Sequence, residues 1–207
     1  MRMALALAAA LFATSPDVAK LILTPSQVGT DYVLLKRTDG AGVKNTTTMD
    51  LCGRKGYPSE QKRLTRLQVN YLKPQGTLGL SNEVVTYRHG GAAQAMREAA
   101  RHAATCPSTP ITTGEPGLPP LRFTITKIKD PRLLKGYLAV KVRVRGTISN
   151  KKIDETSYAV YQRLGDVLSG TYSFGENSPA QLQFVLHAAE QSAHNLLRGH
   201  NAGSPTA

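Results

Sequence analysis

The chain has 207 residues, enough for one domain or two small ones, and its 41% of hydrophobic residues is enough for one core. Lys and Arg number 26 against 14 Asp and Glu, giving a formal net charge of +12 that favours anionic partners: nucleic acid, acidic envelope polymers, anionic lipid or acidic proteins. Only the N-terminus carries a long unbroken apolar run, which excludes a protein held in the membrane by several helices.

The N-terminus has the pattern of a short secretory signal. Arg2 supplies one positive charge, Ala4–Thr14 is an apolar run of 11 residues, and Ser15 follows it. A helix that crosses a bilayer needs about 20 apolar residues, so this run is too short to span. We therefore expect residues 1–15 to be a signal peptide and the protein to be extracellular or associated with the cell envelope. The alternative is the first helix of a cytoplasmic domain.

The first half of the chain predicts two short helical turns, three strands and one helix. Thr24 can cap a turn that begins at Pro25, where the missing N–H costs nothing. Alternation of apolar and polar residues predicts the strands, and an alanine-rich segment predicts the helix. In chain order the expected elements are a turn (Leu23–Val28), a strand (Asp31–Arg37), a loop (Thr38–Asn45), a turn (Thr46–Gly53), strands (Arg66–Lys73 and Leu80–Tyr87) and a helix (Gly91–Thr105).

The second half follows a Pro/Gly-rich linker, Thr109–Leu121, and predicts four strands and a long helix. Ser178 and Pro179 suit the cap and first turn of that helix. The strands are expected at Arg122–Lys129, Tyr137–Ile148, Lys152–Leu164 and Asp166–Phe174. The helix is expected at Pro179–Arg198, with an apolar stripe of Leu182, Val185, Leu186, Ala189, Ala193 and Leu196.

Consecutive strands without intervening helices indicate an antiparallel sheet. We expect an α+β fold in which two main helices cover one face of that sheet. The expected organisation is a single domain over residues 20–199, with the linker near 109–121 inside it, and a disordered tail over 200–207.

Signatures of catalysis are missing from the sequence. There is no GxSxG, GxxxxGK[ST], HExxH or paired CxxC motif. Catalytic triads are recognised by geometry and not by order in the chain, so this lowers the expectation of an enzyme without excluding one. No catalytic residue and no cofactor is predicted.

Three polar residues of the last helix, His187, Glu190 and His194, share one sector beside its apolar stripe. Imidazole and carboxylate groups are ligands of divalent metals, which makes them weak candidates for a metal site. The alternative is an ordinary polar flank, because two turns, about 10 Å, separate the two histidines. We predict no metal site.

A basic strand is the strongest candidate for anion binding. Lys141, Arg143 and Arg145 alternate with valines and face one side of the strand, and Lys127 and Lys129 lie close in sequence. Cations spaced about 6.5–7 Å apart could hold an acidic envelope polymer or an acidic protein. The alternative is a solvated sheet face. Nucleic acid is a weaker candidate, because recognition motifs are absent and export argues against it.

The two cysteines of the chain are Cys52 and Cys106, and an exported protein is expected to pair them. Cys106 ends a helix, where partial negative charge raises the pKa of a thiol and disfavours a nucleophile. A metal site with His102 would need two more ligands. We expect a disulfide, and we expect His102 to be a surface residue near the helix end.

Several segments together resemble a known family. They are LILTPSQV (Leu21–Val28), MDLCG (Met49–Gly53), the helix Ala92–Cys106 and the C-terminal helix. This pattern is similar to the extracellular sensor domain of actinobacterial receptor Ser/Thr kinases of the PknH type and its free-standing secreted and lipoprotein relatives. The resemblance implies an antiparallel sheet flanked by helices, a cleft for an extracellular ligand, and a Cys52–Cys106 pair. Unlike the kinase domains, this chain has no cysteine after 106.

Three functional hypotheses follow. The first is a secreted, non-enzymatic, sensor-like domain that binds a small or anionic ligand of extracellular or envelope origin. The second is a secreted enzyme that acts on envelope or acidic polymers. The third is a cytoplasmic basic adaptor for nucleic acid or an acidic protein. A cleft lined by apolar groups and a few cations would favour the first, and converging carboxylates would favour the second.

Overall fold

The computed structural model describes residues 17–39, 51–52, 57–74, 79–112, 117–174 and 178–202. The predicted signal peptide, most of the loop at 38–45 and most of the turn at 46–53 lie outside this part of the chain. The strands are β1 (Val33–Asp39), β2 (Arg63–Leu72), β3 (Gly79–Tyr87), β4 (Arg122–Ile128), β5 (Leu138–Ile148), β6 (Lys151–Leu164) and β7 (Val167–Phe174). The helices are α1 (Val18–Leu21), α2 (Pro25–Val28), the 3₁₀ helix η1 (Pro58–Lys62), α3 (Gly91–Ala104) and α4 (Pro179–Ala202).

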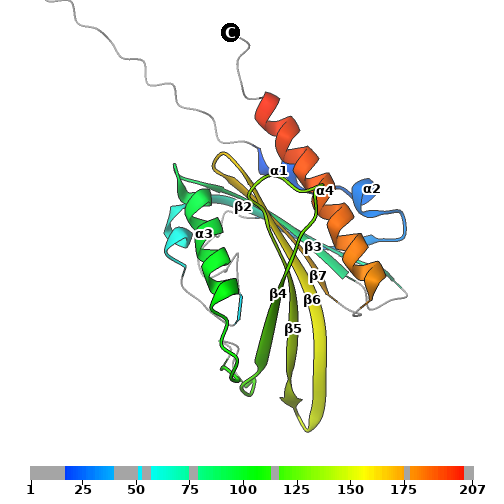
Figure 1. Ribbon diagram of the computed structural model, residues 1–207. Helices are drawn as coiled ribbons and strands as arrows, with labels where there is room; N and C mark the ends of the chain where they lie inside the picture. Colours follow the sequence, from blue (N-terminus) through cyan, green and yellow to red (C-terminus); the bar gives the residue numbers. More distant parts are fainter. Residues whose placement is uncertain are drawn as a thin grey trace, which may run out of the picture.

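One antiparallel sheet contains all seven strands, in the order β1-β2-β3-β7-β6-β5-β4 (Figure 1). The two halves of the chain meet in its centre, where β3 pairs with β7. The turn between β5 and β6 has Ser149 and Asn150 at φ 47° and 63°, as a two-residue type I′ hairpin requires. The predicted α+β class and single antiparallel sheet are confirmed.

The two main helices lie on opposite faces of the sheet, so the expectation that they cover one face is wrong (Figure 1). Val84 of β3 packs in the core beneath α4, and its neighbour Val85 packs in the core beneath α3. Successive side chains of a strand point to opposite faces. Because every residue of β3 is buried, each face needs its own helix.

The segment Leu21–Val28 is fixed to the α4 side of the sheet by buried hydrogen bonds. The Leu23 N–H donates to Asn82 Oδ1 at 2.9 Å, and the Tyr71 hydroxyl donates to the Leu23 carbonyl at 2.9 Å. These bonds satisfy polar groups that would otherwise be costly to bury. The segment that carries the family resemblance is thus an integral part of one core.

The last helix begins as predicted, since the Gln181 N–H donates to Ser178 Oγ at 3.2 Å. It continues to Ala202, beyond the expected end at Arg198 and into the expected tail. Gly199 lies in contact with α1: a Cβ there would approach Leu21 Cδ2 to 2.3 Å. The glycine allows this close packing beside the last turn of α4, which extends into the segment 200–207 expected to be disordered.

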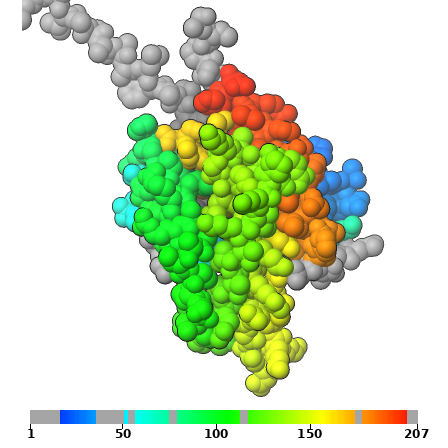
Figure 2. All heavy atoms as spheres, in the orientation of Figure 1, coloured from blue at the N-terminus to red at the C-terminus, as the bar shows by residue number. Residues whose placement is uncertain are grey.

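The distal halves of β4, β5 and β6 form an arm that projects beyond both helices. The yellow β5–β6 hairpin marks its tip in the space-filling view (Figure 2). Burial along β5 changes from three buried residues at its start to alternating half-buried and exposed residues from Arg143 onward. One face of the arm is therefore exposed, while Phe123, Ile125 and Val144 on the other face are half-buried against the α3 core.

Candidate functional site

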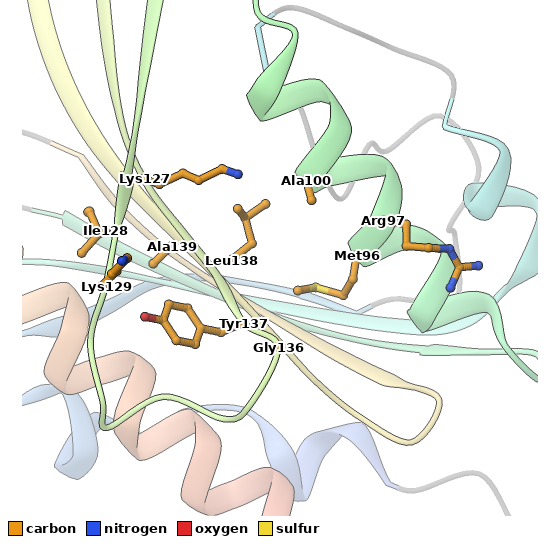
Figure 3. Close-up of a pocket in the computed structure, with 10 residues that line it drawn as sticks. All are labelled: Met96, Arg97, Ala100, Lys127, Ile128, Lys129, Gly136, Tyr137, Leu138 and Ala139. Carbon is orange, nitrogen blue, oxygen red and sulfur yellow. The ribbon is translucent and has the colours of Figure 1, made fainter.

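An open pocket of about 420 Å³ lies between α3 and the start of β5 (Figure 3). This volume is within the range of sites that bind small molecules, about 300–1,000 Å³. Its lining comes from α3 (Met96, Arg97 and Ala100), from the end of β4 (Lys127, Ile128 and Lys129), and from Gly136, Tyr137, Leu138 and Ala139.

Small residues on α3 set the position of this pocket. Ala92, Ala95 and Ala99 are fully buried against the sheet, so the helix packs closely there. Met96 and Ala100 lie beside this contact and face the pocket together with Leu138 (Figure 3). The floor of the pocket is therefore apolar.

The charged groups of the pocket are all cationic among the described residues. Lys127 extends from β4 toward Ala100 of α3, whereas the Arg97 guanidinium points away from the other labelled residues (Figure 3). Lys129 lies at the margin. Lys127 is thus the cation best placed to meet a ligand above the apolar floor.

Asp130, the carboxylate nearest in sequence, does not neutralise Lys127 or Lys129, because Arg132 occupies it. Arg132 donates from Nε to Oδ1 at 2.9 Å and from Nη2 to Oδ2 at 2.7 Å. These hydrogen bonds hold the pKa of Asp130 below its ordinary value. The Asp130 N–H donates to the Tyr137 hydroxyl at 2.6 Å and fixes that ring at the pocket edge.

We expect the Asp130–Arg132 pair to stabilise the loop at neutral pH and to lose this effect in acid. A carboxyl whose pKa is lowered by folding contributes stability above its unfolded pKa, near about 3.9, and loses it as pH falls through the lowered value. Asp130→Asn should therefore be less stable than wild type at pH 7, with a smaller difference well below pH 4. Urea unfolding at both pH values measures this, and an unchanged difference would contradict it.

A second cavity, of about 430 Å³, adjoins a buried ion pair on the same face of the sheet. Arg66 Nε donates to Glu83 Oε1, and the two side chains are 4% and 2% exposed. The Tyr172 hydroxyl donates to Glu83 Oε2 at 3.2 Å. Burial raises the pKa of Glu83, while Arg66 opposes that shift. This cavity therefore has compensated charges, unlike the first.

Gly170 makes the second network possible. It pairs with Glu83 across β3 and β7, and a Cβ at this position would lie 2.1 Å from the Tyr172 hydroxyl oxygen. Tyr172 can reach Glu83 because position 170 has no side chain. This buried group was not predicted, because Leu67, Val69 and Tyr71 alternate with polar residues as in a half-buried strand, and Arg66 falls among the polar positions.

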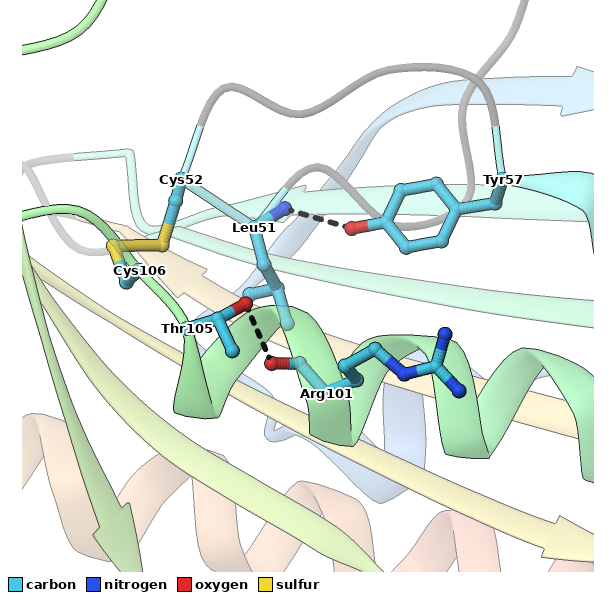
Figure 4. The surroundings of a disulfide bond; sticks show 6 residues. All are labelled: Leu51, Cys52, Tyr57, Arg101, Thr105 and Cys106. Carbon is cyan, nitrogen blue, oxygen red and sulfur yellow. Dashed lines mark hydrogen bonds between the residues drawn. A yellow bond between two sulfur atoms is a disulfide. The ribbon is translucent and has the colours of Figure 1, made fainter.

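The structure joins Cys52 and Cys106 by a disulfide, with Cα atoms 5.7 Å apart (Figure 4). The bond fixes the C-terminal end of α3, which forms one wall of the first pocket. A reactive Cys106–His102 pair is excluded. His102 is not a simple surface residue as expected: it is half-buried, and its ring lies 4.5 Å from that of Tyr57.

The five predicted anion-binding residues divide into two groups. Val140 and Val142 pack in the α3 core, and successive residues of a strand point to opposite faces. Lys141, Arg143 and Arg145 therefore face the α4 side of the sheet. Lys127 pairs with Val140 and therefore faces the opposite side, where it lines the first pocket with Lys129. The structure does not bring all five into one site.

His187, Glu190 and His194 form no group suited to a metal within the described part of the chain. His187 Nδ1 lies 3.9 Å from Glu190 Oε2, and Arg132 Nη1 approaches the same oxygen to 3.7 Å. Arg132 thus links Glu190 to the loop that carries Asp130, which is a structural contact between α4 and that loop.

The fold is similar to that of an extracellular domain of known structure. The crystal structure of the extracellular domain of PknH from Mycobacterium tuberculosis matches over 84% of this chain and 93% of its own, with a TM-score of 0.55 and 12% sequence identity. A putative uncharacterized protein (Rv0999 ortholog) from Mycobacterium smegmatis covers 87% of this chain and 98% of its own, at a TM-score of 0.44 and 9% identity. The match to the extracellular domain of PknH confirms the fold that the sequence resemblance implies.

No family model and no curated protein matches the sequence. Among the described residues, no helix is both long enough and apolar enough to span a membrane.

Proposed function

We propose that the protein is a non-enzymatic, sensor-like domain that binds a small amphipathic anion in the pocket between α3 and β5. The pocket carries the proposal: its floor is apolar and its described charged residues, Arg97, Lys127 and Lys129, are all cations. An acyl chain would cover Met96, Ala100 and Leu138, and an anionic head group would meet Lys127.

The location that fits this function is outside the cytoplasm. The disulfide and the fold shared with an extracellular domain support export, as does the signal-like N-terminus. An enzyme that acts on acidic polymers is the weaker alternative, because no carboxylates converge in this pocket among the described residues. For an exported binding domain, the ligand would come from the envelope or the medium.

The test uses three probes that separate the two parts of the ligand. Octanoate carries a chain and a charge, 1-octanol the chain alone, and acetate the charge alone. We expect calorimetric titration to give the tightest binding for octanoate, by about tenfold or more, because each part adds to the affinity. Equal affinity for octanoate and octanol would contradict a role for the cations.

Lys127→Met is expected to weaken octanoate binding about tenfold and to leave octanol binding unchanged. Methionine retains the apolar stem and removes the charge, so a charge-assisted hydrogen bond is lost. The control is Lys135→Met, which removes one charge from an exposed residue of the following loop that does not line the pocket. The same loss in both variants would show only an effect of net charge.

A further inference from the structure

The α4 side of the projecting arm carries a second collection of cations, separate from the pocket. We call it the basic arm face and define it by Arg122, Lys141, Arg143, Arg145 and Lys152. Strand register places these side chains on one face: Arg145 pairs with Arg122 of β4 on one side and with Asp154 of β6 on the other, and Lys152 pairs with Thr147. The sequence prediction had grouped Lys141, Arg143 and Arg145 with Lys127 and Lys129, which lie on the opposite face, and had left out Arg122 and Lys152.

Two arginines of this face are placed so that one anion could contact both. Arg122 and Arg145 are both exposed and lie directly opposite each other on adjacent strands. Like charges directly opposed across strands destabilise a sheet. Among the described residues neither forms a salt bridge, although Asp154, which lies opposite Arg145 on β6 and is hydrogen-bonded to Arg143, attracts Arg145 electrostatically. A bound anion would further relieve the repulsion between the two arginines.

Asp154 shows which chemical group suits this face. Its carboxylate accepts two hydrogen bonds from Arg143, from Nε at 2.6 Å and from Nη2 at 2.5 Å. Two parallel bonds of this kind are the preferred way in which arginine recognises a carboxylate. The face therefore holds one carboxylate of its own chain, whose hydrogen bonds go to Arg143, while the guanidinium donors of Arg122 and Arg145 could bind another.

The arrangement favours a linear partner over a membrane surface. The exposed large hydrophobic residues among those described are Val33, Leu34, Leu35, Leu64 and Leu197, and none lies on the arm. Between its cations the arm instead carries the threonines Thr124, Thr126 and Thr147. A membrane-docking surface usually adds apolar groups that enter the lipid, and this face lacks them.

We infer that the basic arm face binds a linear acidic polymer that carries repeated carboxylate groups. Cations at alternate positions of β5 lie about 6.5–7 Å apart, and neighbouring strands about 4.8 Å apart, so several groups of one polymer can bind at once. Simultaneous contacts raise the affinity far above that of a single group. This inference does not depend on the pocket or on its ligand.

The test is binding of polygalacturonate to the full chain at low ionic strength, compared with galacturonic acid and with phosphatidylglycerol vesicles. We expect the polymer to bind, with the monomer at least about tenfold weaker. Arg122→Gln/Arg145→Gln should weaken polymer binding about tenfold or more without lowering the thermal midpoint, because it relieves a repulsion. The control Arg88→Gln/Arg101→Gln removes the same charge from exposed residues elsewhere.

Asp154→Asn is expected to change polymer binding in the opposite direction from the double arginine variant. It frees Arg143 from its internal carboxylate, so polymer binding should strengthen about threefold or more. The matched control is Asp31→Asn, which removes an exposed carboxylate paired with Lys73 at 3.5 Å. The inference would be overturned if Asp154→Asn and Asp31→Asn strengthened polymer binding equally, or if the two double arginine variants weakened it equally. Tighter binding to vesicles than to the polymer would also overturn it.

Discussion

Replacing Arg66 with methionine should destabilise the fold by about 3–5 kcal/mol, the range found when one partner of a buried ion pair is removed. Glu83 would keep its buried position, at 2% exposure, without the guanidinium that hydrogen bonds to it. The remaining bond from Tyr172, at 3.2 Å, and the electrostatic attraction of Arg63 do not replace that hydrogen-bonded guanidinium. Urea unfolding at pH 7 measures the free energy.

The double variant Arg66→Met/Glu83→Leu separates the loss of the pair from the loss of packing. With both charges replaced by apolar groups of similar size, much of the stability should return, because no buried charge is left unpaired. A single variant that costs less than about 1 kcal/mol would show that Glu83 is solvated or protonated, and would contradict the buried pair.

Loss of the disulfide is the second large effect. Cys52 and Cys106 are separated by 54 positions, and closing a loop of that length in the unfolded chain corresponds to about 4 kcal/mol of stability. Cys52→Ser should lower the free energy of unfolding by an amount of this order and the thermal midpoint by several degrees. Because the bond fixes the end of α3, octanoate binding should weaken as well.

Reducing agent provides the control for the disulfide prediction. Dithiothreitol should lower the stability of the wild type toward that of Cys52→Ser and leave the variant unchanged. Equal stability of the oxidised wild type and the variant would contradict a structural role for the bond.

Periodicity predicted most of the secondary structure because its signals are local. Alternation located β2, β4 and β5 to within a few residues, and Pro25 and Pro179 marked the starts of two helices. The face that each helix covers could not be predicted. The strand β3 is buried on both sides, and its apolar residues do not alternate in a way that marks one face as the core.

The candidate sites depended on strand register, which the sequence does not specify. Lys127 and Lys141 looked like members of one basic cluster, and register placed them on opposite faces. Arg122 and Arg145 became neighbours through the β4–β5 pairing alone. Arg66 and Glu83 are charged residues in strands, and local alternation cannot predict that they form a buried network beside Leu51 and Tyr172.

The most direct test of the ligand pocket is an NMR spectrum of the protein labelled with ¹³C at its methionine methyl groups. The sequence contains four methionines, and Met96 is the one that lines the pocket among the described residues. Titration with octanoate should shift the Met96 resonance in a saturable way, leave the other methionine signals in place, and have a weaker effect in Lys127→Met. A Met96 signal that does not move while octanoate binds elsewhere would contradict the account.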